Sequence, residues 1–178
     1  MTIGKFDGLH PGHMKLIKRT VEAAKNLGLP SMVFTFYPNP ISVLSGKPFE
    51  PLLSERQKTD ILSGLGVDIL LNFPFDKDFA AISPEEFMKL VFLDLKCKVL
   101  IIGESFRFGK DRQGRASMLA GAGKTYGAAV EILKNVEIDN EPVSSSRIRK
   151  AIDSGSIILA ERLLGRPLKT EVHLFEHT

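Results

Sequence analysis

The sequence predicts an α/β domain in which a parallel β-sheet is covered by helices on both faces. Short apolar runs alternate with segments of helical periodicity along most of the chain. The apolar runs are too short for helices, and glycine or proline bounds several of them. The 178 residues suit one domain with a sizeable core, and 43% hydrophobic content is ordinary for a globular protein. Such alternation is typical of parallel sheets buried on both faces.

The first elements surround a proline-rich segment. An apolar start at residues 1–3 leads into a glycine-rich turn, and residues 14–27 carry a helical apolar stripe that Gly28 would end. Residues 31–37 are β-branched and aromatic and lie between prolines, which predicts a buried strand. Residues 38–51 contain four prolines and predict a long loop, which favours a binding element.

The middle of the chain has two clear helix starts. The capping box at Ser54 predicts a helix to about residue 65, and the one at Ser83 predicts a helix to about residue 95. A strand is expected at residues 67–73, between these helices. Residues 98–103 predict a central strand, because they are short, apolar and ended by glycine.

The last third begins with a polar and aromatic loop at residues 104–114. A helix over 116–126 and a strand over 128–133 complete the alternation. Residues 136–143 predict a short hairpin, because Asp139, Asn140 and Glu141 lie at its centre. Two short helices are expected at residues 144–152 and 157–164, and the domain is expected to span residues 1–167, followed by a tail at 168–178.

Composition restricts the partners and the compartment. A net charge of +3 suits small anionic ligands and is too weak to indicate nucleic acid. The single cysteine, Cys97, allows no internal disulfide and favours a reducing compartment. No apolar run reaches the length of a membrane span, and the N-terminus lacks a signal-peptide pattern, so a cytoplasmic protein is expected. The sequence does not indicate an oligomeric state.

Three predicted loops, at residues 4–13, 38–51 and 104–114, each follow a predicted strand. Because ligands of parallel sheets bind beyond the carboxyl ends of the strands, we expect these loops to form one site. The first loop carries His10 and His13 where a turn becomes a helix, beside glycines that let an anion approach the backbone. This pattern favours phosphate contact and transition-state stabilisation in nucleotidyl transfer. Two surface histidines, or half of a zinc site with His173 or His177, are the alternatives.

A second phosphate-binding pattern lies at residues 144–149. Ser145, Ser146 and Arg149 combine hydroxyls, free helix N–H groups and a forked guanidinium, which suit a terminal phosphate. The alternative is a plain serine cap followed by a solvated basic face. For Asp7, contact with a metal–nucleotide complex is one interpretation, and a turn-stabilising role is the favoured one.

Two aromatic segments could hold a flat ring. Phe106, Arg107, Phe108 and Arg112 alternate aromatic and cationic groups, which can stack on a ring and bind a phosphate; alternatively, the phenylalanines pin the loop to the core. In the other segment, Phe36 is expected in the core, and residues 38–40 to shape a wall for a flat ligand.

Several motifs in order resemble the FMN adenylyltransferase (FAD synthetase) module of the bacterial bifunctional riboflavin kinase/FAD synthetases, of the HxGH nucleotidylyltransferase superfamily. They cover nearly the whole chain: GKFDGLHPGH at 4–13, TFYPNP at 35–40, LLSERQK at 52–58, GESFRFGKDRQG at 103–114, VSSSRIR at 143–149 and LLGRP at 163–167.

The resemblance implies a Rossmann-like fold and the formation of FAD and pyrophosphate from FMN and ATP, with Mg²⁺ accompanying the ATP and no metal held by the protein. Catalysis would fall to His10, His13 and Arg149. The implied ATP and phosphate contacts are Gly4, Phe6, Asp7, Gly12, Ser145, Ser146 and Arg149. The implied flavin contacts are Phe36, Pro38, Asn39, Ser105, Phe106, Arg107, Phe108 and Arg112.

The chain departs from the family pattern at Asn39, where histidine is common, and at Ser105, where Asp or Asn is common. Nothing after the LGRP motif resembles a riboflavin kinase β-barrel, so a monofunctional enzyme or a piece of a longer one is expected. An enzyme with another phosphate acceptor, and a non-catalytic flavin- or nucleotide-binding regulator, are the alternatives.

Overall fold

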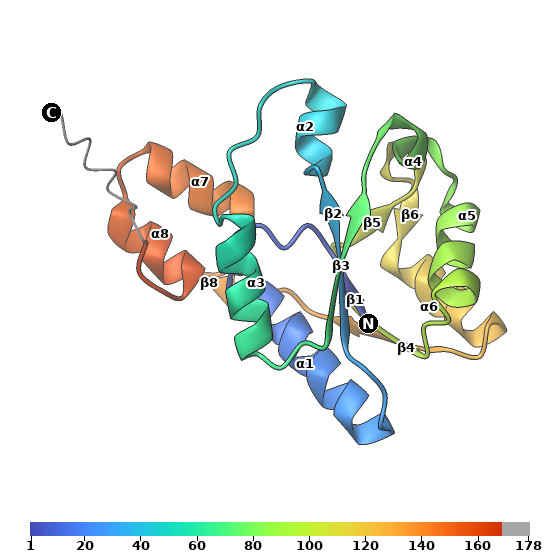
Figure 1. Ribbon diagram of the computed structural model, residues 1–178. Coiled ribbons are helices and arrows are strands. Elements are labelled where there is room, and N and C mark those ends of the chain that lie inside the picture. The colour runs from blue at the N-terminus through green and yellow to red at the C-terminus, as the bar shows by residue number, and fades with distance from the viewer. Residues whose placement is uncertain (169–178) are drawn as a thin grey trace, which may run out of the picture.

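The computed structural model describes residues 1–168, and its centre is a five-stranded parallel β-sheet (Figure 1). The strand order is β3-β2-β1-β4-β7. β1 is two residues long and still lies in the middle, because Thr2 pairs with Val33 on one side and with Ile101 on the other. The strands are β1 (Thr2–Ile3), β2 (Met32–Tyr37), β3 (Ile69–Pro74), β4 (Val99–Gly103) and β7 (Ala129–Leu133).

Helices cover both faces of the sheet, as the sequence predicted. In Figure 1, α1 and α3 lie on one face, and α5 and α6 lie on the other. The capping boxes at Ser54 and Ser83 are both formed, with each serine and the residue three positions later bonding the other's backbone. The helices are α1 (Pro11–Leu27), α3 (Glu55–Gly64), α5 (Pro84–Lys89) with its π-helical continuation η1 (Leu90–Asp94), and α6 (Ala116–Thr125).

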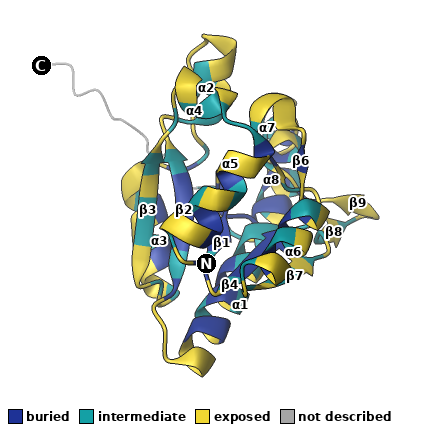
Figure 2. Ribbon diagram, turned by 90° about the vertical axis from the view of Figure 1, so that its right-hand side faces the viewer, coloured by how far each residue is buried: buried dark blue, intermediate teal, exposed yellow. Residues whose placement is uncertain are grey.

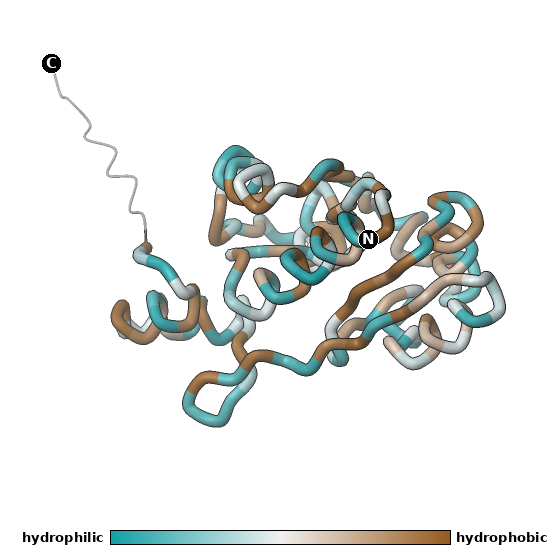
Figure 3. Tube along the Cα trace, turned by 90° about the horizontal axis from the view of Figure 1, so that it is seen from below, coloured by the Kyte–Doolittle hydropathy of each residue, from teal (hydrophilic) through white to brown (hydrophobic). Residues whose placement is uncertain are grey.

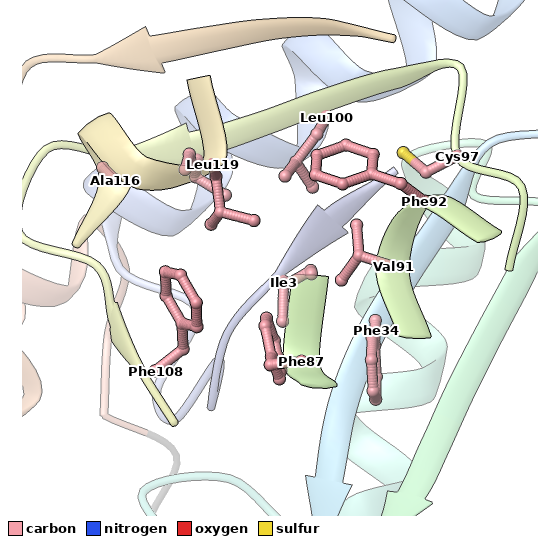
Figure 4. Close-up of a cluster of buried hydrophobic side chains, with 11 residues drawn as sticks. Ile3, Phe34, Phe87, Val91, Phe92, Cys97, Leu100, Phe108, Ala116 and Leu119 are labelled. Atoms are coloured by element: carbon pink, nitrogen blue, oxygen red, sulfur yellow. The ribbon is translucent and has the colours of Figure 1, made fainter. Parts of the chain in front are cut away.

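Successive residues of β2 face two separate layers of core. Val33 packs with Ile17 of α1 and with α3, whereas Phe34 faces Phe87 of α5 and Leu119 of α6. Figure 4 shows this second layer, with side chains of the strands and of both helices pointing into one interior. The buried residues of the sheet lie on its central strands β1, β2 and β4, whereas the edge strands β3 and β7 carry none (Figure 2). Figure 3 shows hydrophobic stretches along the chain.

A third, smaller core lies beside this sandwich. It joins α7 (Ser145–Asp153) and α8 (Ile157–Leu164) to the hairpin of β8 (Glu137–Ile138) and β9 (Glu141–Pro142), as predicted from the sequence. Ile148 and Leu163 are fully buried in it. None of the helices within residues 1–168 is long and apolar enough to span a membrane.

The structure corrects three expectations. α1 begins at Pro11 rather than after His13, because His10 takes the extended cap conformation and proline fits the first helical position. The segment predicted as a loop at 38–51 contains α2 (Pro40–Ser45), which the Asn39 side chain caps at the Ile41 N–H. Two further predicted loops also contain short elements: α4 (Lys77–Ala81), β5 (Arg107–Phe108), η2 (Lys110–Arg112) and β6 (Gly114–Arg115).

Candidate active site

A cavity of about 330 Å³ opens at the carboxyl edge of the sheet. It brings together the loop after β1, the segment around α2 and the start of α7, three parts far apart in the sequence. Five residues predicted for the site line it. The lining consists of Lys5, Asp7, Asn39, Ile41, Pro48, Phe49, Glu50, Ser145, Ser146 and Arg149.

The two histidines form a stacked pair at the start of α1. Their ring centroids are 3.7 Å apart with 20° between the planes, and the buried ring of Phe6 meets His13 edge-on at 5.2 Å. Gly12 makes this stack possible, because a Cβ there would lie 3.1 Å from the His10 ring. Gly4 likewise makes room for Phe6, whose ring would lie 3.1 Å from a Cβ at that position.

Burial keeps this pair uncharged. It lowers the pKa of His10 to about 4, with Asp7 opposing the shift and Arg166 adding to it. Burial, together with His10 and Lys5, holds the pKa of His13 well below its usual value. Both imidazoles are therefore neutral near pH 7. The Nδ1 atom of each is buried without a hydrogen-bond partner in the described part of the chain. The pair therefore acts as neutral hydrogen-bonding groups rather than as cations.

Asp7 ties three segments together. Its carboxylate accepts hydrogen bonds from the Leu52 N–H at 2.9 Å and from the Arg149 guanidinium at 2.8 Å. Its carbonyl oxygen accepts one from the Ser145 hydroxyl at 2.8 Å. Asp7 is buried, so these bonds are shielded from water. Asp7 thus fixes the first loop to α7, a wider role than stabilising its own turn.

Arg149 is held on two sides, by the Asp7 carboxylate and by the ring of Phe49, whose centroid lies 4.6 Å from its guanidinium carbon. Ser144 caps α7 by accepting a hydrogen bond from the Arg147 N–H. Ser146 is exposed at the cavity. The start of α7 therefore presents a hydroxyl and a preoriented guanidinium, a combination that suits a phosphate.

Arg166 holds the loop that precedes α1 and carries His10, called here the histidine loop. Its guanidinium donates hydrogen bonds to the carbonyl oxygens of Gly8 at 2.5 Å, Leu9 at 3.2 Å and Leu164 at 3.5 Å. Burial lowers the pKa of this group. Sequence reasoning missed Arg166, although it lies in the LLGRP motif, because nothing local to that motif shows that the first loop is its partner.

The second loop lines much of the cavity, but Asn39 is the one residue predicted there for the site that belongs to the lining. Asn39 lines it while capping α2, and Pro38 is exposed. Phe36 packs among aromatic rings, with centroids 5.6 Å from Phe75 and 5.9 Å from Phe79. It therefore belongs to the border of the core, as the sequence suggested.

The third loop does not line the cavity. Phe108 is buried, with its ring centroid 4.8 Å from that of Phe87, and Figure 4 shows it among the core side chains. Phe106 stacks on Phe108 at 5.9 Å, so both phenylalanines pin the loop to the core. The guanidinium of Arg107 bonds to carbonyl oxygens of its own loop. The Ser105 hydroxyl lies 3.4 Å from the Asn135 side chain, and Arg112 is exposed.

Lys5 and Phe49 are cavity residues that sequence reasoning missed. Lys5 lies within the first motif, between two residues that were singled out. No sequence pattern marks Phe49 as a site residue, because its contact with Arg149, 100 positions away in the chain, exists only in the folded protein. Among residues 1–168, no group of three or more His, Cys, Asp or Glu side chains could hold a metal ion. His173 and His177, the other possible zinc ligands, lie outside the described residues, as does the tail from 169 to 178.

The chain matches the family model of FAD synthetase over residues 1–147. It is 37% identical over 169 residues to the bifunctional riboflavin kinase/FMN adenylyltransferase of Pseudomonas fluorescens. The aligned region covers 94% of this chain and 54% of that protein. The corresponding protein of Escherichia coli K12 is 35% identical over the same shares. The chain thus spans about half the length of these curated relatives.

Solved structures agree on the fold. A Streptococcus pneumoniae protein described as a macrolide-efflux protein superposes with a TM-score of 0.80 and 32% identity, over 94% of this chain and 55% of that one. A pantoate–β-alanine ligase from Francisella tularensis, 22% identical, shares the fold with a TM-score of 0.52, over 92% of this chain and 69% of its own. With the family model matched from the first strand to the start of α7, this chain belongs to the FAD synthetase family.

Proposed function

We propose that this chain transfers AMP from ATP to FMN, giving FAD and pyrophosphate. The observation that carries the proposal is the neutral His10–His13 stack beside the start of α7, where Ser145 and Arg149 are tied to Asp7. The histidine stack, Asp7 and Ser145 lie in the segment that matches the FAD synthetase model, and Arg149 lies two residues beyond its end. The curated relatives that carry the same segment are named for FMN adenylyltransferase activity.

In this reaction, a phosphate oxygen of FMN attacks the α-phosphorus of ATP, and the bond from that phosphorus to the oxygen of the leaving pyrophosphate breaks. The FMN phosphate is already ionised at neutral pH, so the protein needs no strong base. His10 and His13 donate hydrogen bonds to charge that builds on the phosphate oxygens. Arg149 and Ser146 hold the β- and γ-phosphates, which aligns the leaving group opposite the attacking oxygen.

Magnesium fits this site as a companion of ATP. The described residues offer no cluster of ligands for a resident ion, and the buried carboxylate at the cavity, that of Asp7, is bonded to Arg149 and to the Leu52 N–H. Mg²⁺ is commonly held by substrate phosphates and water with few protein ligands. When bound with ATP, it would neutralise phosphate charge. We place the reaction in the cytoplasm, where the buried thiol of Cys97 would stay reduced.

An adenylyltransferase with a different phosphate acceptor is the second candidate. It is favoured by the third loop, whose Ser105, Arg107 and Arg112 were expected to bind flavin and do not line the cavity. The nucleotide side of the site is the same in both candidates, so the acceptor alone separates them.

The deciding experiment is product analysis after incubation of the purified chain with Mg²⁺–ATP and FMN, with riboflavin as a parallel substrate. Chromatography should show FAD and pyrophosphate from FMN and no new flavin from riboflavin. The His13→Ala variant is the control for a contaminating enzyme. ATP binding without FAD formation would overturn the proposal and favour another acceptor or a regulator.

A further inference from the structure

Lys5 is a cavity residue to which the site described so far assigns no role. It lies two residues after the end of β1 and lines the cavity with Ser145, Ser146 and Arg149. Within residues 1–168, no carboxylate lies within ion-pair distance of its ammonium group, because the nearby carboxylate of Asp7 is taken by Arg149. Lys5 is therefore a cavity cation that makes no ion pair within the described residues, although the carboxylates of Asp7 and Glu50 also line the cavity.

The charged groups that act on Lys5 include two arginines and one carboxylate. Burial lowers its pKa, and the charges of Arg112 and Arg149 lower it further, whereas Asp7 opposes the shift. The charge of Lys5 in turn lowers the pKa of His13. Its ammonium group is thus within electrostatic reach of the third loop, the start of α7 and the histidine pair. A cluster of cations of this kind is stabilised by an anion that lies between them.

The reaction brings two anions into this space. The start of α7 serves the β- and γ-phosphates of ATP, whereas the acceptor has a phosphate dianion that must approach the α-phosphorus against charge repulsion. Lys5 lines the same cavity as Arg149 and Ser146, so its ammonium group can reach a second anion bound beside the phosphates of ATP. A lysine suits the task, because its compact charge on a flexible stem can follow a phosphate as the new bond forms.

We infer that Lys5 is a catalytic residue whose ammonium group binds the phosphate of the acceptor and lowers its repulsion from the α-phosphate of ATP. The inference rests on the proposed function. Lys5 keeps its proton throughout, and it forms no covalent bond. The new bond joins the acceptor oxygen to the α-phosphorus, and the pair of electrons from the broken bond leaves with pyrophosphate.

Equilibrium binding of FMN and riboflavin separates this role from others, because the two flavins differ only in the phosphate. Binding to the protein is followed by the quenching of flavin fluorescence. The titrations use wild type, Lys5→Met, Lys5→Arg and the control Lys18→Met, which removes an exposed lysine on α1. Each titration is made with and without the α,β-methylene analogue of ATP, which cannot release pyrophosphate. Thermal unfolding verifies that the variants are folded.

We expect wild type to prefer FMN over riboflavin and Lys5→Met to lose FMN affinity about ten- to a hundredfold, as for a lost charged hydrogen bond. Riboflavin affinity should not change, Lys5→Arg should keep most of the preference, and Lys18→Met should match wild type. A Lys5→Met variant that still prefers FMN, or that loses ATP affinity instead, would overturn the inference. A wild-type chain that binds neither flavin would overturn the proposed function itself, which is visible before any variant is made.

Discussion

Two regions of the molecule, a phosphate side at the candidate site and an aromatic side in the core, are built in different ways. The phosphate side joins the first loop to α7 and Arg166 through hydrogen bonds between residues more than 130 positions apart. The aromatic side, formed by the end of β2, α4, α5 and the third loop, is held by ring contacts, such as Phe73 with Phe79 at 4.8 Å and Phe87 with Phe108 at 4.8 Å.

The two kinds of contact differ in how strictly they fix the positions of their atoms. A buried hydrogen bond requires a given atom at a given place, and its loss leaves a polar group without a partner. Ring contacts tolerate several geometries and can repack after a substitution of similar volume. The phosphate side should therefore respond to small changes with losses of turnover, and the aromatic side with modest losses of stability.

The largest effect is expected for His13→Ala. Removal of one preorganised hydrogen-bond donor from the transition state lowers kcat about 10²- to 10³-fold, or roughly 3 kcal/mol. Steady-state formation of FAD measures it, with thermal unfolding as a check of the fold. His10→Ala should show a loss of the same order, because the two rings form one stack. Near-normal turnover in either variant would contradict the proposed role.

Acidification is expected to destabilise the phosphate side. The pKa of His10 is about 4 in the fold and about 6.5 when unfolded, so between these values the unfolded chain binds the additional proton. Stability is therefore unaffected by His10 above pH 6.5 and falls as the pH drops from 6.5 towards 4. For this residue the loss reaches up to about 3 kcal/mol, at roughly 1.4 kcal/mol for each pKa unit.

Urea unfolding of wild type and of His10→Phe over this pH range measures the loss. The variant removes the titrating group while keeping an aromatic ring, so its stability should fall less steeply with acidification. Parallel curves for the two proteins would show that His10 is not held neutral by the fold.

Arg166→Met tests the support behind the histidines. The carbonyl oxygens of Gly8 and Leu9 would lose their donor, which costs roughly 2 kcal/mol of stability. A loosened loop should lower kcat while the KM for ATP changes little, because the start of α7 is intact. Arg166→Lys should restore part of kcat through one remaining hydrogen bond. An increase in the KM for ATP with unchanged kcat would assign Arg166 to substrate binding instead.

The smallest effect is expected on the aromatic side. Phe87→Leu exchanges a buried ring for a side chain that can repack against Phe79 and Phe108, at a cost of about 1 kcal/mol in unfolding free energy. Turnover should stay within about twofold of wild type, since no hydrogen bond of the phosphate side changes. A kcat loss as large as that of His13→Ala would remove the distinction between the two sides.

The fold could be predicted largely from local signals. The capping serines at positions 54 and 83 and the apolar run of β4 each act within a few residues, and all three were found where expected. α2 was missed, because the prolines around it indicate a loop equally well, and only the Asn39 cap with Pro40 in the first turn marks the helix. The strand order was not predicted, since it depends on pairing between distant segments.

The candidate site was predictable where a residue type carries chemistry by itself. His10, His13 and Arg149 are of this kind: the structure places the two histidines in one stack and Arg149 at the cavity, and their catalytic role stays a prediction. Phe49 and Arg166 are not, because their partners, Arg149 and the carbonyl oxygens of the first loop, are adjacent only in the folded chain. Long-range contacts of this type leave no spacing that a sequence pattern could reveal.

The bond from Arg166 to Gly8 has a consequence for how the domain is made. It joins two residues 158 positions apart, whereas the last strand of the sheet ends at Leu133. During synthesis, all five strands therefore leave the ribosome before the residue that secures the histidine loop. Contacts so distant in sequence also form slowly, because a long chain must close first. A nascent chain stopped before residue 166 can thus contain a complete sheet and an unsupported histidine loop, so the candidate site would be completed among the last steps of folding.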